Sequence, residues 1–447
     1  MNKIKWIIII LLVVSLVPKA FSGQTRRLSL DEVIGIALKN NLDIKEAQEM
    51  ITGREAVVGE VKSEWYPNLT LSLGSGYDKT LNVPGEPQTF EFLGQTYEIA
   101  SPLTSQWSNA LSLNLTQNIY TGGRITGSLR EAMAGVETVR GDYEIDRQNL
   151  VLRVKKSYWE LIRAELLVKL REEMVDHYQE TLELATSRLS KGAIAPIEVE
   201  QARVNLVNEE DNLIQARTMR REVEDELKAL IEIGFEAEIR PIDKPDSSIS
   251  FRLDMDRSVQ MAINKRVELA RLRQEIEILK GALMVAKSGR YPHLVLRAGY
   301  DWAGSDRNYE DAWDNLEATS WNIGLSLNYS IFDGHLTKNK VKEAESNLEV
   351  AKYKLKEKEK EIVKEARKAY YQLISAKERI QAIKENVELA QENLRIGKLQ
   401  FKVGTITSNE VNNYQVSLSE VKTKYIGALI DYEIAKARLE WTMGGGR

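Results

Sequence analysis

Two glycines interrupt long runs of helix-forming residues, one in RLSKGAIAPIEVEQARVNL (Arg188–Leu206) and the other in QFKVGTITSNEVNNYQVSL (Gln400–Leu418). Glycine is common just after the last residue of a helix because it accepts a left-handed backbone conformation. Gly192 and Gly404 therefore each predict a reversal between two helices. The Glu-Val pair that follows each glycine at the same distance indicates one design used twice.

The chain contains an internal repeat, in which one sequence unit occurs twice. Gly404 lies 212 positions after Gly192. The same offset aligns Tyr120-Thr121-Gly122 with Phe332-Asp333-Gly334, Tyr158-Trp159 with Tyr370-Tyr371, and Leu227 with Leu439. Nearer the N-terminus an offset of 225 aligns Trp65-Tyr66-Pro67 with Arg290-Tyr291-Pro292. The 13 additional residues of the first unit fall in the Pro- and Gly-bearing stretch Asn82–Tyr97.

Each unit has the same predicted order of elements: amphipathic helix, strand, loop, strand, long helix, turn and helix. We expect a first repeat at 23–233 and a second at 254–447, joined by a linker at 234–253. In the first repeat the strand hairpin is predicted at 66–120, the long helix at 124–190 and the last helix at 196–232. The corresponding segments of the second repeat are 291–332, 336–402 and 408–442.

The long helices carry a coiled-coil seam. Between Lys340 and Lys402 apolar or small residues alternate at spacings of three and four, with one clear interruption at Lys358. The first repeat has the same seam in register, and its interruption falls at Asp146. At ~1.5 Å of rise per residue each long helix measures roughly 100 Å, so it must pack against other helices.

Four segments alternate apolar and polar residues, as strands do. They are LTLSL (69–73), LSLNL (111–115), LVLRAGY (294–300) and WNIGLSLNYSI (321–331). A half-buried strand of a soluble protein shows the same alternation. Here Trp or Tyr residues stand at the segment ends, the lengths approach the ~10 residues of a membrane-spanning strand, and no helix pattern is left to cover the apolar face. We therefore interpret the Leu face as facing lipid.

Four strands cannot close a barrel, and an open edge cannot lie in hydrocarbon because its backbone groups have no partners. Copies of the chain must therefore share one barrel. Two copies supply about 8 strands, around an interior that side chains fill, whereas three supply about 12 and leave an aqueous lumen. The small polar inward faces favour three copies. The predicted fold class is mainly α with a membrane β-barrel, in which a trimer continues the barrel as a helical one.

The N-terminus has the features of a secretory signal: Lys3 and Lys5, then the apolar run Trp6–Val17, then the small-residue pattern Ala20-Phe21-Ser22. An uncleaved anchor is the alternative. The run of about 12 residues is shorter than the roughly 20 that a spanning helix needs. We therefore expect a signal peptide at 1–22 and an exported protein.

Composition argues against several classes of function. The net charge is −4 and the cationic residues alternate with glutamates along helices, so no nucleic-acid partner is expected. Cysteine is absent, which excludes disulfides and thiolate chemistry. The three histidines, His177, His293 and His335, stand on separate segments, so neither a His-based metal site nor a catalytic triad is expected. We predict no cofactor and no enzymatic activity.

The duplicated order of elements resembles that of the TolC family of outer-membrane efflux proteins. So do the corners Tyr-Thr-Gly-Gly-Arg (Tyr120–Arg124) and Phe-Asp-Gly-His (Phe332–His335) and the glycine turns, and the resemblance covers about Leu28 to Gly444. It implies a homotrimeric channel-tunnel, with a 12-stranded barrel in outer-membrane lipid and an α-helical barrel across the periplasm. Its far tip would stay closed until a periplasmic adaptor and an inner-membrane efflux pump or ABC exporter engage it. The strand-to-helix corners would be formed by Gly122, Gly123 and Gly334.

The resemblance also implies roles at the two helical turns. The periplasmic tip, where the adaptor docks, would contain Gly192, Ile194, Gly404 and Ile406. Glu198 and Glu410 match inward carboxylates of the family, and three copies of Glu410 would form a ring that attracts cations at a pore constriction. The alternative for both is an ordinary first-turn glutamate stabilised by the helix N-terminus.

The chain departs from the family's gate pattern at three positions. Asn413 replaces a second carboxylate, Phe401 replaces an aromatic residue that carries a hydroxyl, and Ile406 stands where the family has an arginine. We assign Phe401 and Asn413 to the constriction by position, and these departures leave open whether the gate uses the family's polar latch.

The leading hypothesis is a passive, gated exit duct for small molecules or polypeptides that takes its energy from a partner. One alternative is a secreted or periplasmic coiled-coil scaffold whose strands form a small soluble sheet. Another is an envelope hydrolase on a helical stalk. The sequence offers no plausible combination of a nucleophile and a general base for it.

Overall fold

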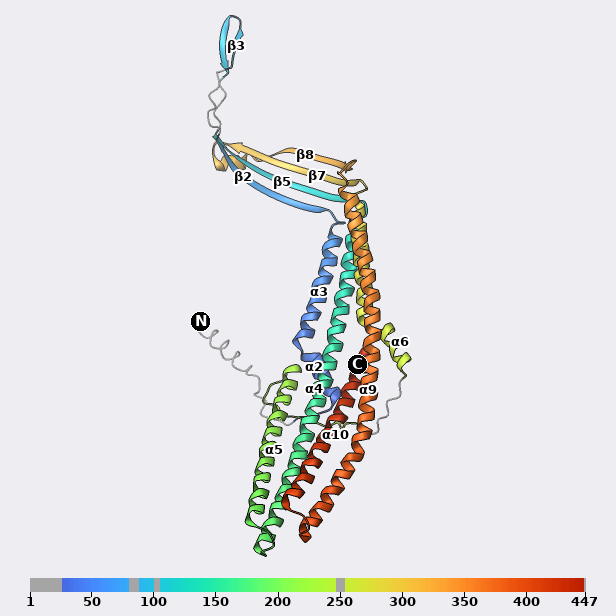
Figure 1. Cartoon of the computed structure of the whole chain (residues 1–447). Coiled ribbons are helices and arrows are strands. Elements are labelled where there is room, and N and C mark those ends of the chain that lie inside the picture. The colour runs from blue at the N-terminus through green and yellow to red at the C-terminus, as the bar shows by residue number, and fades with distance from the viewer. Residues whose placement is uncertain (1–25, 80–87, 100–104, 247–253, 446–447) are drawn as a thin grey trace, which may run out of the picture. The chain divides into compact units, whose positions relative to one another are not determined.

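The computed structural model describes residues 26–79, 88–99, 105–246 and 254–445 (Figure 1). The predicted signal peptide and part of the predicted linker lie outside these residues. The chain divides into two compact units. Unit 1 is drawn from residues 1–50, 140–271 and 355–447, and unit 2 from 51–139 and 272–354.

Helices make up most of the described chain. They are α2 (Leu30–Asn40), α3 (Leu42–Ser63), α4 (Arg124–Ser190), α5 (Pro196–Leu230), α6 (Met255–Lys265), α7 (Val267–Ser288), α8 (Tyr309–Asp314), α9 (Leu336–Val403) and α10 (Ser408–Thr442). The strands are β1 (Arg26–Leu28), β2 (Asn68–Lys79), β3 (Gln88–Phe92), β4 (Gln95–Ile99), β5 (Ser105–Tyr120), β6 (Ile239–Pro241), β7 (His293–Asp306) and β8 (Glu317–Asn328). No described helix has a stretch long and apolar enough to cross a membrane.

Unit 2 contains a four-stranded antiparallel sheet in the order β2-β5-β7-β8. Leu113 of β5 lies opposite Leu71 of β2 on one side and Tyr300 of β7 on the other. Within the described residues β2 and β8 have no further strand neighbour, so both are edge strands. Their alternating apolar residues leave 63% to 67% of their surface exposed: Leu69, Leu71, Leu73, Ile323, Leu325 and Leu327.

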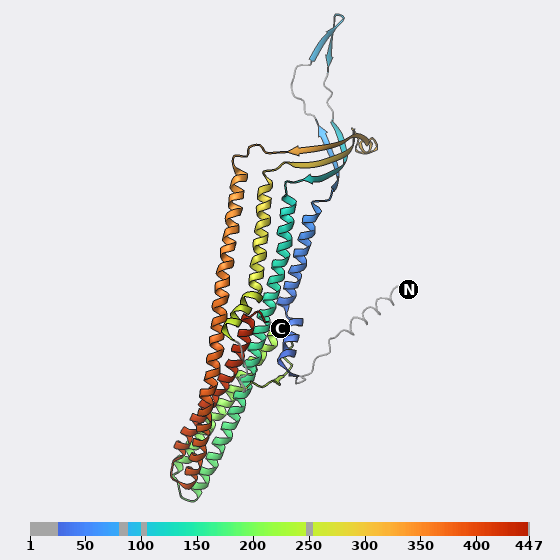
Figure 2. The same cartoon turned by 90° about the vertical axis from the view of Figure 1, so that its right-hand side faces the viewer.

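The helical segments of unit 2 lie side by side in the order α3, α4, α7, α9, which matches the order of the strands that adjoin them (Figure 2). The backbones of α4 and α7 come very close at two glycines. A Cβ atom on Gly127 would lie 2.9 Å from the carbonyl oxygen of Gly281, and one on Gly281 would lie 2.7 Å from that of Gly127. Arg130 and Glu277 form an ion pair across the same two helices at 2.5 Å.

Unit 1 contains two helical hairpins, α4–α5 and α9–α10, which lie side by side (Figure 1). Their shared apolar cluster includes Met174 and Val411, both fully buried. Every seam position predicted in the two long helices is buried or half-buried, which confirms the seam. Of the interruptions, Asp146 is exposed, and Lys358 is half-buried and donates to Glu361 at 2.8 Å.

A short parallel sheet of β1 and β6 also belongs to unit 1 and was not expected from the sequence. The buried Tyr158 of α4 holds this sheet, because its hydroxyl bonds the carbonyl oxygen of Leu28 at 2.9 Å and the Asp243 carboxylate at 2.8 Å. The segment that precedes the α4–α5 hairpin and the segment that follows it are therefore held together by this sheet and by Tyr158.

The prediction of a single helix at the start of each repeat is wrong, because the structure has two consecutive helices there. The first break follows α2 at Asn41, whose side-chain oxygen accepts from the backbone N–H of Ile44 at 3.3 Å. The second follows α6 at Arg266, which bonds Glu268 and Glu365 and stacks over the Trp441 ring. Both breaks stand at positions related by the offset of 225. The loops between strands also hold elements that were not expected, the β3–β4 hairpin and α8.

We expect Gly127→Ala to lower the thermal unfolding midpoint of the purified protein, because the added methyl meets the backbone of α7 and forces the helices apart. Overpacking of this kind costs about 1–3 kcal/mol. Gly135→Ala, on the same helix with open space at its Cβ position, is the matched control. Alanine favours helix by up to about 1 kcal/mol over glycine, so the control midpoint should stay or rise. Equal midpoints for the two variants would contradict the close approach.

Candidate functional site

The candidate site is the pair of turns that connect α4 to α5 and α9 to α10 in unit 1. Gly192 has φ 74° and Gly404 has φ 91°, so both occupy the left-handed region that favours glycine. At the first turn the N–H of Ala193 donates to the carbonyl of Arg188 at 2.9 Å. At the second the N–H of Thr405 donates to the carbonyl of Gln400 at 3.0 Å. Each glycine thus ends its long helix while the last carbonyls keep hydrogen-bond partners.

The helices that follow the two turns begin differently. α10 begins with a capping box: the Thr407 hydroxyl accepts from the N–H of Glu410 at 3.4 Å, and the Glu410 carboxylate accepts from the N–H of Thr407 at 2.8 Å. α5 begins with Ala195 and Pro196, and Ala195 has no side chain that could cap. Glu410 is therefore an exposed carboxylate held in a fixed position at the turn.

Glu198, the equivalent residue of the first repeat, lies in another environment. It is half-buried, and its Oε2 atom is buried without a hydrogen-bond partner among the described residues. Its carbonyl oxygen lies 3.5 Å from the Ser408 hydroxyl of the second turn. The two glutamates are thus equivalent in sequence but not in structure.

Arg188 joins the two turns. Its Nη1 atom donates to the carbonyl oxygen of Phe401 at 2.9 Å, and its guanidinium lies 5.0 Å from the centre of the Phe401 ring. A Cβ atom on Gly404 would lie 2.9 Å from Nη2 of Arg188. One cation of α4 therefore caps the C-terminal end of α9, where unpaired carbonyls carry partial negative charge. Sequence reasoning missed this residue.

A polar cluster farther from the turns also crosses between the hairpins. Lys398 of α9 donates to Glu180 at 2.6 Å and lies 3.0 Å from Nδ1 of His177, both on α4. Burial and the nearby Lys398 charge lower the pKa of His177, and the hydrogen bond from Lys398 lowers the pKa of Glu180. Gln415 of α10 donates to the carbonyl of His177 at 3.0 Å. Lys422 of α10 pairs with Glu173 of α4 at 2.6 Å.

The other residues predicted at the turns have mixed surroundings. Ile194 and Ile406 are half-buried against the apolar cluster of the hairpins. Phe401 is only 1% exposed in that cluster, so its ring packs inside the chain. Its place at a pore constriction, like that of the exposed Asn413, stays a prediction. The structure adds two apolar residues beside the turns that sequence reasoning missed, Ile197 at 71% and Val403 at 75% exposure.

The predicted strand-to-helix corners lie in unit 2. Gly122, Gly123 and Gly334 all have left-handed φ angles, and a Cβ atom on Gly122 would lie 2.8 Å from the Ser288 carbonyl oxygen. The second corner also has Asp333, whose carboxylate accepts from the N–H of Thr337 at 2.8 Å. Hydrogen bonds from Thr337 lower the pKa of Asp333.

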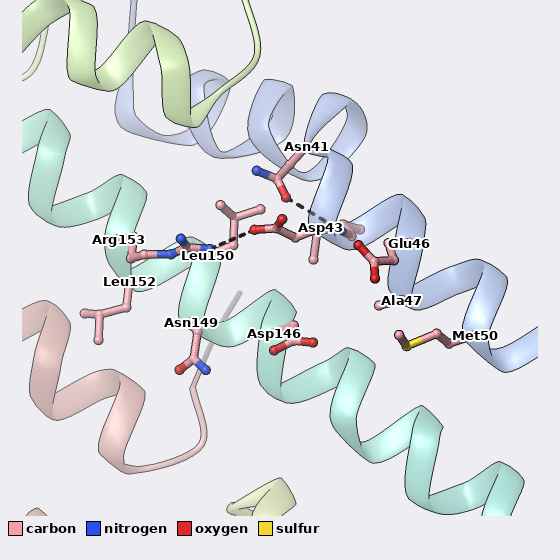
Figure 3. Close-up of a pocket in the computed structure, with 11 residues that line it drawn as sticks. Asn41, Asp43, Glu46, Ala47, Met50, Asp146, Asn149, Leu150, Leu152 and Arg153 are labelled. Atoms are coloured by element: carbon pink, nitrogen blue, oxygen red, sulfur yellow. Dashed lines mark hydrogen bonds and ion pairs between the residues drawn. The ribbon is translucent and has the colours of Figure 1, made fainter.

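An acidic pocket of about 570 Å³ lies between the start of α3 and the middle of α4 (Figure 3). Asp43, Glu46 and Asp146 line it, and Arg153 pairs with Asp43 at 3.5 Å. Partial desolvation at the pocket and the neighbouring carboxylates of Asp142 and Asp43 raise the pKa of Asp146. Across the described residues no group of three or more His, Asp or Glu side chains is arranged to hold a metal ion.

A protein-family model described as outer membrane efflux protein matches residues 33–231 and 258–445. The matched segments correspond to the two repeats, and the gap between them falls mostly in the predicted linker.

Curated relatives are of the same kind. Outer membrane protein TolC of Salmonella enteritidis is 22% identical over 441 residues, which span 96% of this chain and 85% of the relative. The alkaline protease secretion protein AprF of Pseudomonas aeruginosa is 24% identical over 311 residues, which span 66% of this chain and 62% of the relative.

Solved structures share the fold. CusC, a protein described for its transmembrane channel formation, matches with a TM-score of 0.80 at 16% identity over 96% of both chains. The predicted fold class, a duplicated protomer of the channel-tunnel type, is thereby confirmed.

The lowered pKa of His177 predicts a loss of stability in acid. Between that lowered pKa and the ordinary value of about 6.5 the unfolded chain binds more protons, so stability rises with pH and is lost as pH falls. His177→Gln should therefore narrow the difference between the thermal midpoints measured at about pH 7.5 and about pH 5. His335→Asn, at a left-handed corner position that Asn tolerates, is the control. A His177 variant with an unchanged pH dependence would contradict this account.

Proposed function

Since this chain belongs to the outer membrane efflux protein family, we propose that three copies of it form a passive, gated exit duct. The sequence resemblance to the TolC family is confirmed, and the protein is located in the outer membrane and extends into the periplasm. The observation that carries the proposal is a sheet of four strands that has, among the described residues, two unpaired edges and an exposed apolar face.

The sheet supports a shared barrel for two physical reasons. Lipid can cover the exposed leucines of β2 and β8, whereas water makes that exposure unfavourable by about 25 cal/mol per Å² of apolar surface. The alternate residues of the strands are small and polar, such as Ser72, Asn114 and Ser326, and suit a wet interior. Three copies supply about 12 strands, a number that leaves a lumen between the walls.

The helical turns are proposed as the end of the duct that meets its partners. Ile197 and Val403 are exposed apolar residues beside the turns, which a docked partner would cover. We propose that a periplasmic adaptor docks there on Gly192, Ile194, Gly404 and Ile406. An inner-membrane pump or ABC exporter would supply energy and cargo.

Small molecules and polypeptides are both candidate cargoes. The name of AprF describes secretion of a protease, which favours a polypeptide for that relative. We propose that this chain performs no catalysis, in keeping with the channel and secretion proteins that it resembles.

A secreted or periplasmic coiled-coil scaffold without channel activity is the alternative. It explains the long helices but not the exposed leucines on both edge strands. Reconstitution in planar lipid bilayers separates the two. The duct predicts detergent-dependent extraction and stepwise ionic conductance, whereas a protein that is monomeric without detergent and does not conduct would exclude it.

We expect Glu410→Gln to reduce the cation preference of the reconstituted pore. Glutamine keeps the hydrogen bonds of the capping box and removes the charge, so the helix start is preserved. At about 0.1 M salt, where charges act over ~10 Å, the cation-to-anion permeability ratio should fall on the order of twofold.

The matched control for that change is Glu388→Gln, which removes an exposed carboxylate of α9 away from the turns. It should leave permeability as in the parent protein. Unchanged selectivity in the Glu410 variant would remove Glu410 from the pore constriction.

A further inference from the structure

A buried asparagine lies on the apolar face of the sheet in unit 2. Asn109 of β5 is 1% exposed, and neither its side-chain oxygen nor its side-chain nitrogen has a hydrogen-bond partner among the described residues. Because side chains alternate along a strand, Asn109 shares its face with Leu111 and Leu113. An amide that is buried without hydrogen bonds costs free energy. A partner from outside the described chain would remove this cost.

The short helix α8 covers Asn109. In the sheet Asn109 lies opposite Gly304 of β7. A Cβ atom on Gly304 would lie 3.0 Å from the carbonyl oxygen of Asn315, the residue that follows α8. At the start of α8, Tyr309 packs edge-on against Trp107 with the ring centres 5.0 Å apart. One end of α8 therefore lies beside Asn109, and the other lies over the next residue on the same face of β5.

Two carboxylates and two further amides surround the ends of α8. Asp306 of β7 accepts from the backbone N–H of Asn308 at 3.1 Å and from the side chain of Asn315 at 3.3 Å. The side chain of Asn308 donates in turn to Asp311 at 2.8 Å. These four residues form one connected group, which we call the α8 cluster.

The register of the sheet places Asn109 against the α8 cluster. Asp306 lies opposite Trp107, two positions along each strand from the pair of Asn109 and Gly304. Asp306 and Asn109 are therefore diagonal neighbours on one face, about 7–8 Å apart along the backbone. Since Gly304 has no side chain, the end of α8 takes its place beside the Asn109 amide.

We propose that the α8 cluster and Asn109 bind a divalent cation, with Ca²⁺ as the best fit, between α8 and the sheet. Asp306 and Asp311 supply the negative charge. The amide oxygens of Asn109, Asn308 and Asn315 supply neutral ligands. Ca²⁺ takes about six to eight oxygens, from carboxylates and from asparagine side chains alike. The site goes beyond the proposed duct and does not depend on it.

The spacing of the cluster suits one ion. Oxygens that bind Ca²⁺ at about 2.4 Å lie roughly 3.4 Å apart when they stand at right angles around it. The side-chain contacts of Asn315 with Asp306 and of Asn308 with Asp311, at 3.3 and 2.8 Å, are of this order. An amide that turns over puts its oxygen where its nitrogen was. Two oxygens then face each other, an arrangement that a cation stabilises.

The ligand set predicts weak binding. It differs from a metal-holding group of three or more His, Asp or Glu side chains, which the described residues lack, because asparagines supply most of its oxygens. The affinity of a Ca²⁺ site follows the charge of its ligands. With two carboxylates we expect a dissociation constant on the order of 10⁻⁴ to 10⁻³ M, as in extracellular modules.

A buried water molecule is the alternative partner of Asn109. Such a water makes about three hydrogen bonds to buried polar groups. It needs neither the charge of Asp306 nor that of Asp311, whereas a cation needs both. The two carboxylates therefore distinguish the two partners.

Binding can be measured with Tb³⁺, which occupies Ca²⁺ sites and emits light when a nearby tryptophan is excited. Trp107 and Trp313 both contact Tyr309 of α8 and can sensitise it. The full-length protein, purified in detergent and treated with EDTA, should give Tb³⁺ emission that saturates and that Ca²⁺ displaces. Asp306→Asn should weaken binding by at least about tenfold, the lower end of what the loss of a supporting group costs a metal site.

Glu317→Gln is the matched control, because it removes the same charge at the same end of the sheet. Glu317 of β8 lies opposite Ala303, the neighbour of Gly304, and so stands on the other face. This variant should bind Tb³⁺ as the parent protein does.

Asn109→Leu separates a ligand from a residue with a structural role only. Leucine has a similar volume and removes the unpaired amide, so the thermal midpoint measured in EDTA should stay or rise. Ca²⁺ should raise the midpoint of the parent protein, because it binds the folded state, and this rise should be largely lost in the variant. An equal rise in both proteins would remove Asn109 from the site. If the leucine variant does not fold, Asp306→Asn gives the same comparison.

Three results of the Tb³⁺ measurement would overturn the site. The first is the absence of saturable emission, as expected for a water molecule. The second is an equal loss in the Asp306 and Glu317 variants, which would indicate unspecific attraction to acidic residues. The third is emission that no variant changes, which would place the cation elsewhere, for example on phosphates of bound lipid. None of them affects the conductance by which the proposed duct is judged.

Discussion

The backbone groups along the outer edges of β2 and β8 set the constraint on which this structure depends. Each strand is 12 residues long and has a neighbour on one side only within the described chain. In hydrocarbon an unpaired N–H or C=O group costs several kcal/mol, because no water is present to bond it. In the proposed duct a single chain would leave both edges without partners, and further copies of the chain supply them.

The duplication provides a simple solution to this constraint. Both halves share one sequence design, so the edge strands β8 and β2 are equivalent in sequence to the paired inner strands β5 and β7. The glycines that let α4 and α7 approach, Gly127 and Gly281, belong to the internal contact only, since their equivalents are Asn339 and Ala56.

The fold was largely predictable because its main signals are periodic. The heptad seam is a local pattern, and its positions are buried or half-buried, whereas Asp146 at its interruption is exposed. The breaks at Asn41 and Arg266 were missed because the helical pattern continues across them. The polar side chains that mark those breaks act through partners that only the folded chain supplies, such as Glu365 for Arg266.

The candidate site was predictable where its signals are local in the sequence. The turns follow from glycine alone, and the capping box could have been found from Thr407 and Glu410, since a threonine followed by glutamate three positions later is a known start signal. The contact of Arg188 with Phe401 could not, because the two residues are 213 positions apart and meet only when the hairpins pack. Glu198 and Glu410 look alike in sequence, yet Ala195 offers no hydroxyl where Thr407 does.

The central claim is that the open sheet is closed by further copies of the same chain in the membrane. The most direct measurement is the mass of the protein extracted from the outer membrane into lipid nanodiscs, with lipid and scaffold subtracted. The account predicts three chains per disc. A single chain per disc, with the protein still folded and embedded, would contradict it.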